Sequence, residues 1–144
     1  MGPHQQTEDI FNIAKYPTQC YSQVVAITIF ETSDFERQIE KLISKNKLSK
    51  DDFNDFKKNL AINPEQGDLI IGTGGIRKAR LKSSNKGKSG GFRVCYLYLD
   101  NRLFLFLLFI YSKNEQSGLL PKEKSLLKTI SDSIKKRIKN EQII

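Results

Sequence analysis

The chain has 144 residues, with 24 lysines and arginines against 16 aspartates and glutamates, a formal net charge of +8. This length predicts a single domain, and the charge favours polyanionic partners: RNA, DNA, an acidic protein or an anionic membrane surface. The longest apolar run, 103–111, is shorter than the roughly 20 residues of a membrane span. Cys20 and Cys95 belong to no CxxC or Cys/His cluster, so we expect no zinc site and two reduced thiols in a cytoplasmic protein.

The first half of the chain predicts one strand followed by two helices. Residues 1–22 are polar and mixed, and we expect an N-terminal arm there, possible disorder included, before a single domain over 23–144. Residues 24–30 are rich in β-branched side chains, which predicts a strand. A helix stop is predicted at Asn46.

Two apolar stripes indicate how the helices pack. Thr32 or Ser33 can cap the first helix, and its stripe consists of Phe35, Ile39, Leu42 and Ile43. The segment 49–52 has the form of a capping box for the second, whose stripe consists of Phe53, Phe56, Lys57 and Leu60. The turn-forming segment 63–68 ends this helix. A two-helix hairpin is therefore predicted.

The second half predicts a sheet. Residues 69–71 indicate a short strand, 72–75 a glycine turn, and 76–82 a strand that alternates loosely between apolar and basic side chains. A basic, glycine-containing loop spans 83–91, and 92–99 reads as another strand.

The end of the chain predicts a hairpin and a helix. Asp100 and Asn101 form an expected two-residue turn, and 103–111 is apolar on both faces, as in a central, doubly covered strand. Pro121 opens a last helix, whose stripe consists of Leu126, Leu127, Ile130, Ile134 and Ile138. The predicted fold is α+β: a small antiparallel-rich sheet with the helical hairpin on one face, and a C-terminal helix.

Basic residues are concentrated in a segment that lacks acids. Residues 69–99 contain no aspartate or glutamate. The basic residues of 77–93 are Arg77, Lys78, Arg80, Lys82, Lys86, Lys88 and Arg93. On a strand Lys78, Arg80 and Lys82 share one face, and Arg77 points the other way. Such a face can bind phosphates, although a solvated basic strand and loop is the plainer alternative.

Other chemistries lack their residues. The turn Gly72–Gly75 matches neither dinucleotide nor P-loop motifs, so we interpret it as structural. His4 is the only histidine, and the predicted sheet offers no acidic metal ligands. RNA cleavage without a metal stays possible, because RNA carries its own 2′-hydroxyl nucleophile and cations can stabilise the transition state. Tyr96, Tyr98 and Tyr111 are candidates for base stacking, with packing the alternative for the first two.

Three stretches resemble toxins of the RelE/HigB superfamily, most closely the HigB-like branch. They read NPEQGDLIIGTGGIRKARL (63–81), GKSGGFRVCYLYLD (87–100) and LFLLFIYSKNEQSGL (105–119). The resemblance covers about residues 24–135. It implies a RelE-like fold and the toxin of a toxin–antitoxin pair. It also implies a ribosome-dependent endoribonuclease that cleaves translated mRNA without a metal or other cofactor, is inhibited by a cognate antitoxin, and stops translation.

The resemblance also implies roles for individual residues. Arg80 and Arg93 are expected to stabilise transition-state charge, and Lys78 and Lys113 to transfer protons or contact phosphate. Residues expected to bind RNA or the ribosome are Arg77, Lys82, Lys86, Lys88 and Tyr111. The sequence departs from RelE-type members at Asn114, where they often have a second basic residue, and at 116–119, which lacks their tyrosine or histidine. The proton-transfer group is therefore open.

Two other functions fit the same residues. A non-catalytic module that binds RNA or the ribosome and blocks translation would use the same basic face, and the missing late tyrosine or histidine favours it. A gyrase-directed toxin of the ParE type would share the scaffold, but the dense basic strand and loop favour RNA.

Overall fold

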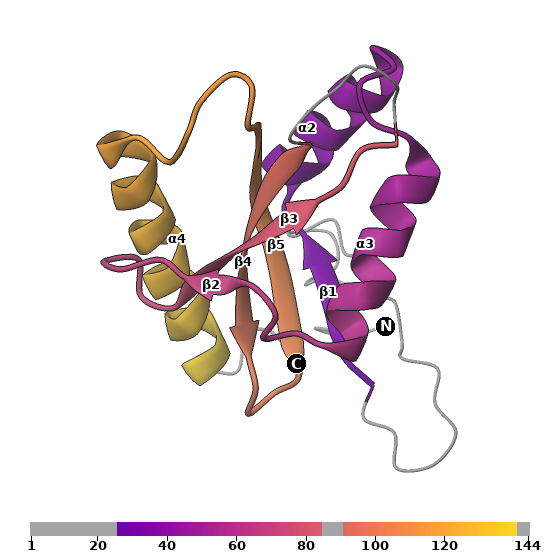
Figure 1. The fold of residues 1–144 in the computed structure, drawn as a ribbon. Helices are drawn as coiled ribbons and strands as arrows, with labels where there is room; N and C mark the ends of the chain where they lie inside the picture. The colour runs from indigo at the N-terminus through magenta and orange to yellow at the C-terminus, as the bar shows by residue number, and fades with distance from the viewer. Residues whose placement is uncertain (1–25, 85–90, 141–144) are drawn as a thin grey trace.

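The computed structural model describes residues 26–84 and 91–140, which form a five-stranded mixed sheet with helices on both faces (Figure 1). The strands are β1 (Thr28–Glu31), β2 (Asp68–Leu69), β3 (Ile76–Leu81), β4 (Phe92–Leu99) and β5 (Phe104–Ser112). The helices are α2 (Ser33–Ser44), α3 (Lys50–Ile62) and α4 (Pro121–Lys139). The predicted N-terminal arm, residues 1–22, lies outside the described residues.

The strand order is β1-β5-β4-β3-β2. β1 pairs with β5 in parallel, and the other three pairings are antiparallel, which confirms the α+β, antiparallel-rich prediction. β5 has neighbours on both edges and helices over both faces, as its doubly apolar sequence predicts. The middle strand of the order is β4. The β4–β5 register shifts between Cys95 and Tyr96, where Leu108 of β5 has no partner in β4, as in a β-bulge.

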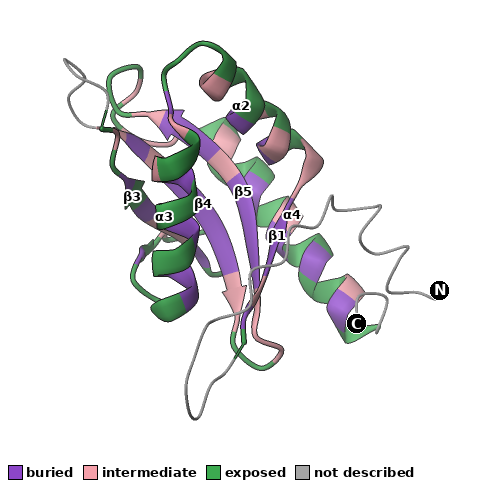
Figure 2. Ribbon diagram, turned by 90° about the vertical axis from the view of Figure 1, so that its right-hand side faces the viewer, coloured by how far each residue is buried: buried purple, intermediate pink, exposed green. Residues whose placement is uncertain are grey.

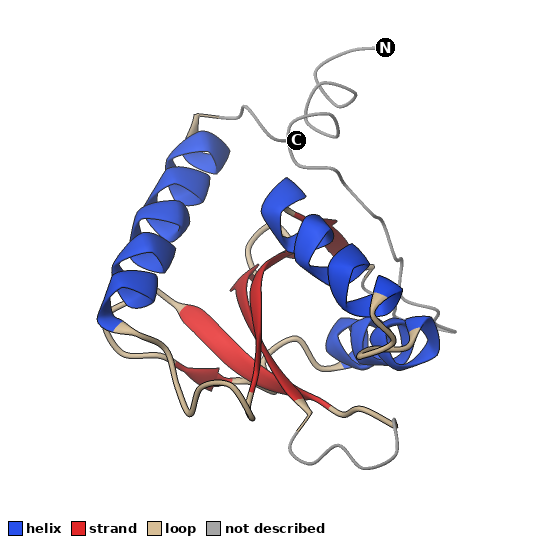
Figure 3. Cartoon of the chain, turned by 90° about the horizontal axis from the view of Figure 1, so that it is seen from above, coloured by secondary structure: helices blue, strands red, loops and turns tan. Residues whose placement is uncertain are grey.

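α2 and α3 cover one face of the sheet. The side chain of Thr32 accepts the Phe35 N–H at 3.3 Å, and that of Ser49 accepts the Asp52 N–H at 2.9 Å, so both helices begin where capping residues predict. Phe35 and Leu60 are fully buried against strand residues such as Val94. Figure 3 shows both helices on the side of the sheet opposite α4. The prediction that both helices pack on one face of the sheet is confirmed.

α4 covers part of the other face. Leu127, Ile134 and Ile138 are buried against the sheet, as the apolar stripe predicts. Leu126 is wrongly assigned to that stripe, because it is 59% exposed on the outer side of the helix. In Figure 2 the buried colour follows the strands and the inner sides of the helices.

Some predicted boundaries are wrong. β1 begins at Thr28, so residues 26 and 27 of the predicted strand 24–30 are not part of it; 24 and 25 lie outside the described residues. β2 ends at Leu69, and Ile70 and Ile71 lead into the following turn. The β4–β5 connection is a four-residue turn, 100–103, rather than the two-residue turn Asp100–Asn101. In it Leu103 has φ 60°, a left-handed conformation that a hydrophobic run does not reveal.

Candidate functional site

A row of polar side chains crosses three strands at one end of the sheet. Arg80 of β3 is paired with Arg93 of β4, and Arg93 is paired with Tyr111 of β5. The same face carries Cys95 and Leu97, which belong to the core cluster under α4. Directly paired residues on one face lie about 5 Å apart at Cβ, so the pairing gathers side chains that are distant in sequence. We call Arg80, Arg93 and Tyr111 the cationic row.

Two predicted catalytic lysines flank this row. Lys78 is paired with Cys95, one step toward the sheet centre on the same face, and is half-buried. Lys113 follows the end of β5, where its N–H donates to the Gly91 carbonyl at 3.2 Å, and its side chain is exposed. The fold thus brings Lys78, Arg80 and Arg93 onto one face and Lys113 to the same end of the sheet.

Tyr111 is buried in a way that leaves its hydroxyl unsatisfied. The residue is 6% exposed, and within the described part of the chain its hydroxyl has no hydrogen-bond partner. Burial raises the pKa of Tyr111 above its ordinary value; the nearby Cys95 and Glu123 act in the same direction, and Arg93 opposes them. The phenol is therefore protonated at neutral pH and can donate a hydrogen bond. Base stacking on Tyr111, as predicted, would require its cover to move.

Cys95 lies under α4 as an inert thiol. It is fully buried, and this burial raises its pKa to about 12, although the Lys78 ammonium acts in the opposite direction. A thiol with so high a pKa is a poor nucleophile at neutral pH. Cys20 lies outside the described residues.

Glu123 is a carboxylate beside this site that sequence reasoning missed. It stands in the first turn of α4, one turn before the buried Leu127, and its charge raises the pKa of both Cys95 and Tyr111. One carboxylate oxygen accepts the Leu120 N–H and the Gln116 side-chain N–H, both at 2.9 Å. A signal was present, because an acid three residues after a helix cap is typical of a capping box.

The other predicted RNA-binding residues are more dispersed. Arg77 faces the α2–α3 side, where its guanidinium donates to the carbonyls of Glu65 (3.1 Å) and Gly67 (2.7 Å) and so holds the loop before β2. Lys82 follows the end of β3 and is exposed; together with Arg80 it borders a hollow beside α3. Lys86 and Lys88 lie outside the described residues.

Tyr96 is not available for base stacking. Its side chain is fully buried on the α2–α3 face. Its hydroxyl donates to the Pro64 carbonyl at 2.7 Å and accepts the Gly67 N–H at 3.0 Å. The packing alternative is therefore correct for this residue.

The glycine turn 72–75 is structural, as interpreted. Thr73 is fully buried; its hydroxyl donates to the Ile70 carbonyl at 2.7 Å and accepts the Ile76 N–H at 3.2 Å. The Gly74 carbonyl accepts hydrogen bonds from Ser131 (3.0 Å) and Lys135 of α4. Gly74 has φ 75°, which glycine adopts without strain. The turn thus fixes α4 to the start of β3.

Fold and site together define a class: a small basic α+β protein with a cationic sheet end suited to a polyanion. Within residues 26–84 and 91–140 no group of acidic, histidine and cysteine side chains is placed to hold a metal ion. Over the same residues no helix is long and apolar enough to span a membrane.

The sequence model of one protein family matches residues 27–143; the family is described as the RelE toxin of the RelE / RelB toxin–antitoxin system. The match covers most of the chain and nearly all of the described fold. The chain belongs to the RelE toxin family.

Proposed function

We propose that this toxin is a ribosome-dependent endoribonuclease that cleaves translated mRNA without a metal ion. The supporting observation is the cationic row, in which strand pairing sets Arg80 beside Arg93, with Lys78 one step away on the same face. Like charges directly opposite in a sheet are unfavourable, so a bound phosphate is the natural counterion for this pair.

The row suits transesterification by the RNA's own 2′-hydroxyl. That oxygen attacks the adjacent phosphorus while the bond from phosphorus to the 5′-oxygen breaks, leaving a cyclic phosphate and a free 5′-hydroxyl. Arg80 and Arg93 stabilise the extra negative charge of the transition state. One proton leaves the 2′-hydroxyl and another reaches the departing oxygen, and Lys78 and Lys113 are the candidates for these transfers. Tyr111 keeps its proton and serves as a hydrogen-bond donor.

Cellular partners follow from the family and the charge. Toxins of this family pair with an antitoxin. For this chain we expect an acidic or amphipathic antitoxin that neutralises the cationic surface, since complementary charge speeds association. The site of action is then the cytoplasm, where ribosomes translate mRNA.

The test is to map mRNA 5′ ends in a purified translation reaction, with and without ribosomes, at the magnesium concentration that translation needs. We expect cuts within translated codons only when both ribosomes and the toxin are present. Cleavage of free RNA at the same positions in the absence of ribosomes would contradict the proposal.

A non-catalytic translation blocker is the second candidate, and the covered hydroxyl of Tyr111 favours it. A blocker would inhibit translation in proportion to the fraction of ribosomes that have bound it, and it would leave the mRNA intact. Titration of the toxin against a fixed number of ribosomes separates the two, because an enzyme inhibits well below one molecule per ribosome.

A further inference from the structure

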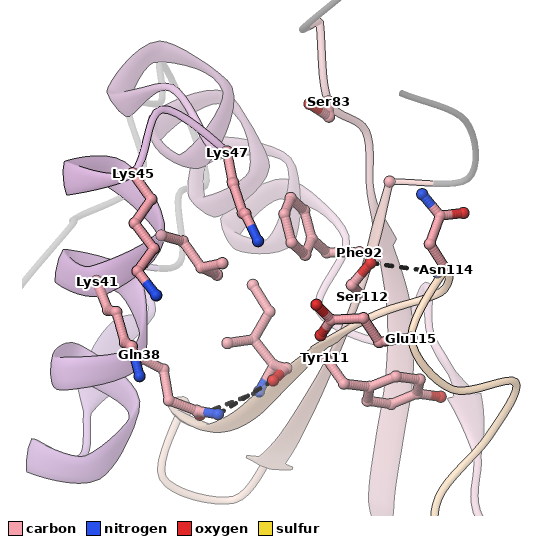
Figure 4. A pocket seen from close by; sticks show the side chains of 13 residues that line it. Gln38, Lys41, Lys45, Lys47, Ser83, Phe92, Tyr111, Ser112, Asn114 and Glu115 are labelled. Atoms are coloured by element: carbon pink, nitrogen blue, oxygen red, sulfur yellow. Dashed lines mark hydrogen bonds between the residues drawn. The ribbon is translucent and has the colours of Figure 1, made fainter. Parts of the chain in front are cut away.

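A hollow lies on the α2 side of the strand ends that carry the cationic row (Figure 4). Its volume is about 400 Å³, and it lies between the C-terminal half of α2 and the adjoining ends of β4 and β5. Binding sites for small ligands have volumes of about 300–1,000 Å³, so the hollow has room for a group the size of one nucleotide.

Three lysines stand over this hollow. Lys41 comes from α2, Lys45 is its C-terminal capping residue and Lys47 belongs to the turn that follows. Their side chains extend over the cavity (Figure 4). All three are exposed, and in the described part of the chain none forms an ion pair. Lys41 and Lys45 are four residues apart, a spacing at which like charges destabilise a helix. The helix dipole favours cations at this end, but it does not explain why three gather over one cavity.

The floor of the hollow is apolar and firmly held. Leu42, Phe92 and Ile110 line it. The Gln38 side chain donates to the Ile110 carbonyl at 3.1 Å and accepts the Ile110 N–H at 3.3 Å, which ties α2 to β5 beneath the lysines. An apolar floor with cations above it suits a nucleobase and its phosphate. Glu115 at the border supplies an acceptor that base amino groups can satisfy and acidic side chains cannot.

The hollow and the cationic row lie on opposite faces of the sheet, at the same ends of β4 and β5. Tyr111 lines the hollow, yet its ring points away from the lysines in Figure 4 and belongs to the core cluster under α4. Phe92, which lines the hollow, is followed at once by Arg93 of the row. A chain that bends around the ends of β4 and β5 can therefore place one nucleotide on each face.

We infer that the hollow binds a nucleotide of the RNA substrate next to the one that is cleaved, with Lys41, Lys45 and Lys47 holding its phosphate. The identity of the ligand as RNA rests on the proposed function. The hollow thereby selects which bases flank the cut, because only the flanking base reaches its floor.

Methyl-labelled protein titrated with a 2′-O-methylated tetranucleotide, which cannot be cleaved, tests this inference by NMR. We expect saturable shifts of the Leu42 and Ile110 methyl signals, with the side-chain Nε–H of Arg93 reporting the cationic row and Ile76 as a remote reference. The triple change Lys41→Ala, Lys45→Ala and Lys47→Ala should weaken the response by about tenfold or more. The matched triple change Lys58→Ala, Lys136→Ala and Lys139→Ala removes equal charge elsewhere and should weaken it much less.

The outcomes separate this inference from the proposed function. Shifts at Arg93 without shifts at Leu42 and Ile110 would overturn the inference and leave the cationic row as an RNA site. An acidic peptide that moves the two methyl signals when the tetranucleotide does not would also overturn it, and would assign the hollow to a protein partner. If neither the Arg93 signal nor the Leu42 and Ile110 methyl signals shift, and mRNA also stays intact in translation reactions, the proposed function is refuted.

Discussion

The two faces of the sheet differ in how completely their polar groups are satisfied. On the α2–α3 face the buried Tyr96 hydroxyl has two partners, and Lys57 pairs with Glu31 at 3.0 Å. On the α4 face the buried Tyr111 hydroxyl has none within the described residues, and Arg80 lies beside Arg93. Buried polar groups are normally paired, so the interior of the first face follows the usual pattern and the buried Tyr111 hydroxyl of the second departs from it.

The buried ion pair of the satisfied face gives the largest expected stability effect. Lys57 and Glu31 are 3% and 5% exposed, and the Lys57 ammonium also lies 4.2 Å from the Phe53 ring centroid. Glu31→Gln leaves a buried ammonium without its counterion and should lower the free energy of unfolding by about 3–5 kcal/mol in urea titrations. The exposed pair Asp34–Arg37 is the control, and Asp34→Asn should cost about 1 kcal/mol or less. Equal effects would contradict the contrast between buried and exposed pairs.

Replacing each of the two buried tyrosines by phenylalanine compares the two faces directly, through the change in the free energy of unfolding. Tyr96→Phe leaves the Gly67 N–H and the Pro64 carbonyl without their partner and should destabilise the fold by about 1–3 kcal/mol. Tyr111→Phe removes a hydroxyl that has no partner among residues 26–84 and 91–140, and it should leave stability unchanged or slightly raised. Thermal and urea unfolding of both variants provide the measurement. A larger loss for Tyr111→Phe would mean that its hydroxyl is satisfied in solution.

Cys95 offers a smaller test of how tightly α4 covers its face. In a Cys20→Ser background the remaining thiol should resist alkylation at neutral pH in the folded protein and react once urea unfolds it. Its pKa of about 12 lies above the unfolded value of 9.0, so the folded state holds the proton more tightly. The contribution of the Cys95 thiol to the free energy of unfolding is therefore fully present below pH 9 and is lost as the pH rises toward 12. Cys95→Ala should flatten that part of the stability curve, and rapid alkylation of native protein would show that α4 opens readily.

Sequence patterns predicted the local features of this fold well. Alternation placed Lys78 and Arg80 on one face and Arg77 on the other, and capping residues located the helix starts. The parallel partner of β1 was not predictable, because no local pattern reports which distant strand it joins. The same holds for the pairing of Arg93 with Tyr111, which depends on the β4–β5 register and its bulge.

The environment of the site was harder to predict than its residues. The approach of Glu123 to Tyr111 depends on how α4 docks, and that docking is fixed by hydrogen bonds to the Gly74 carbonyl. The lysine hollow joins α2 to strand ends that follow it by some 50 to 70 positions, so no spacing rule points to it. The assignment to the HigB-like branch stays a prediction, as do the roles of the individual site residues.

The single-turnover cleavage rate of Arg93→Ala on mRNA-programmed ribosomes tests the central claim most directly. Arg102→Ala is the matched control, because it removes the same charge in the turn at the opposite end of β4. We predict that Arg93→Ala lowers the rate by about 100- to 1,000-fold with unchanged stability, as expected for the loss of a group that stabilises transition-state charge, and that Arg102→Ala cleaves normally. Equal rates for Arg93→Ala and the wild type would contradict the assignment of the cationic row as the catalytic site.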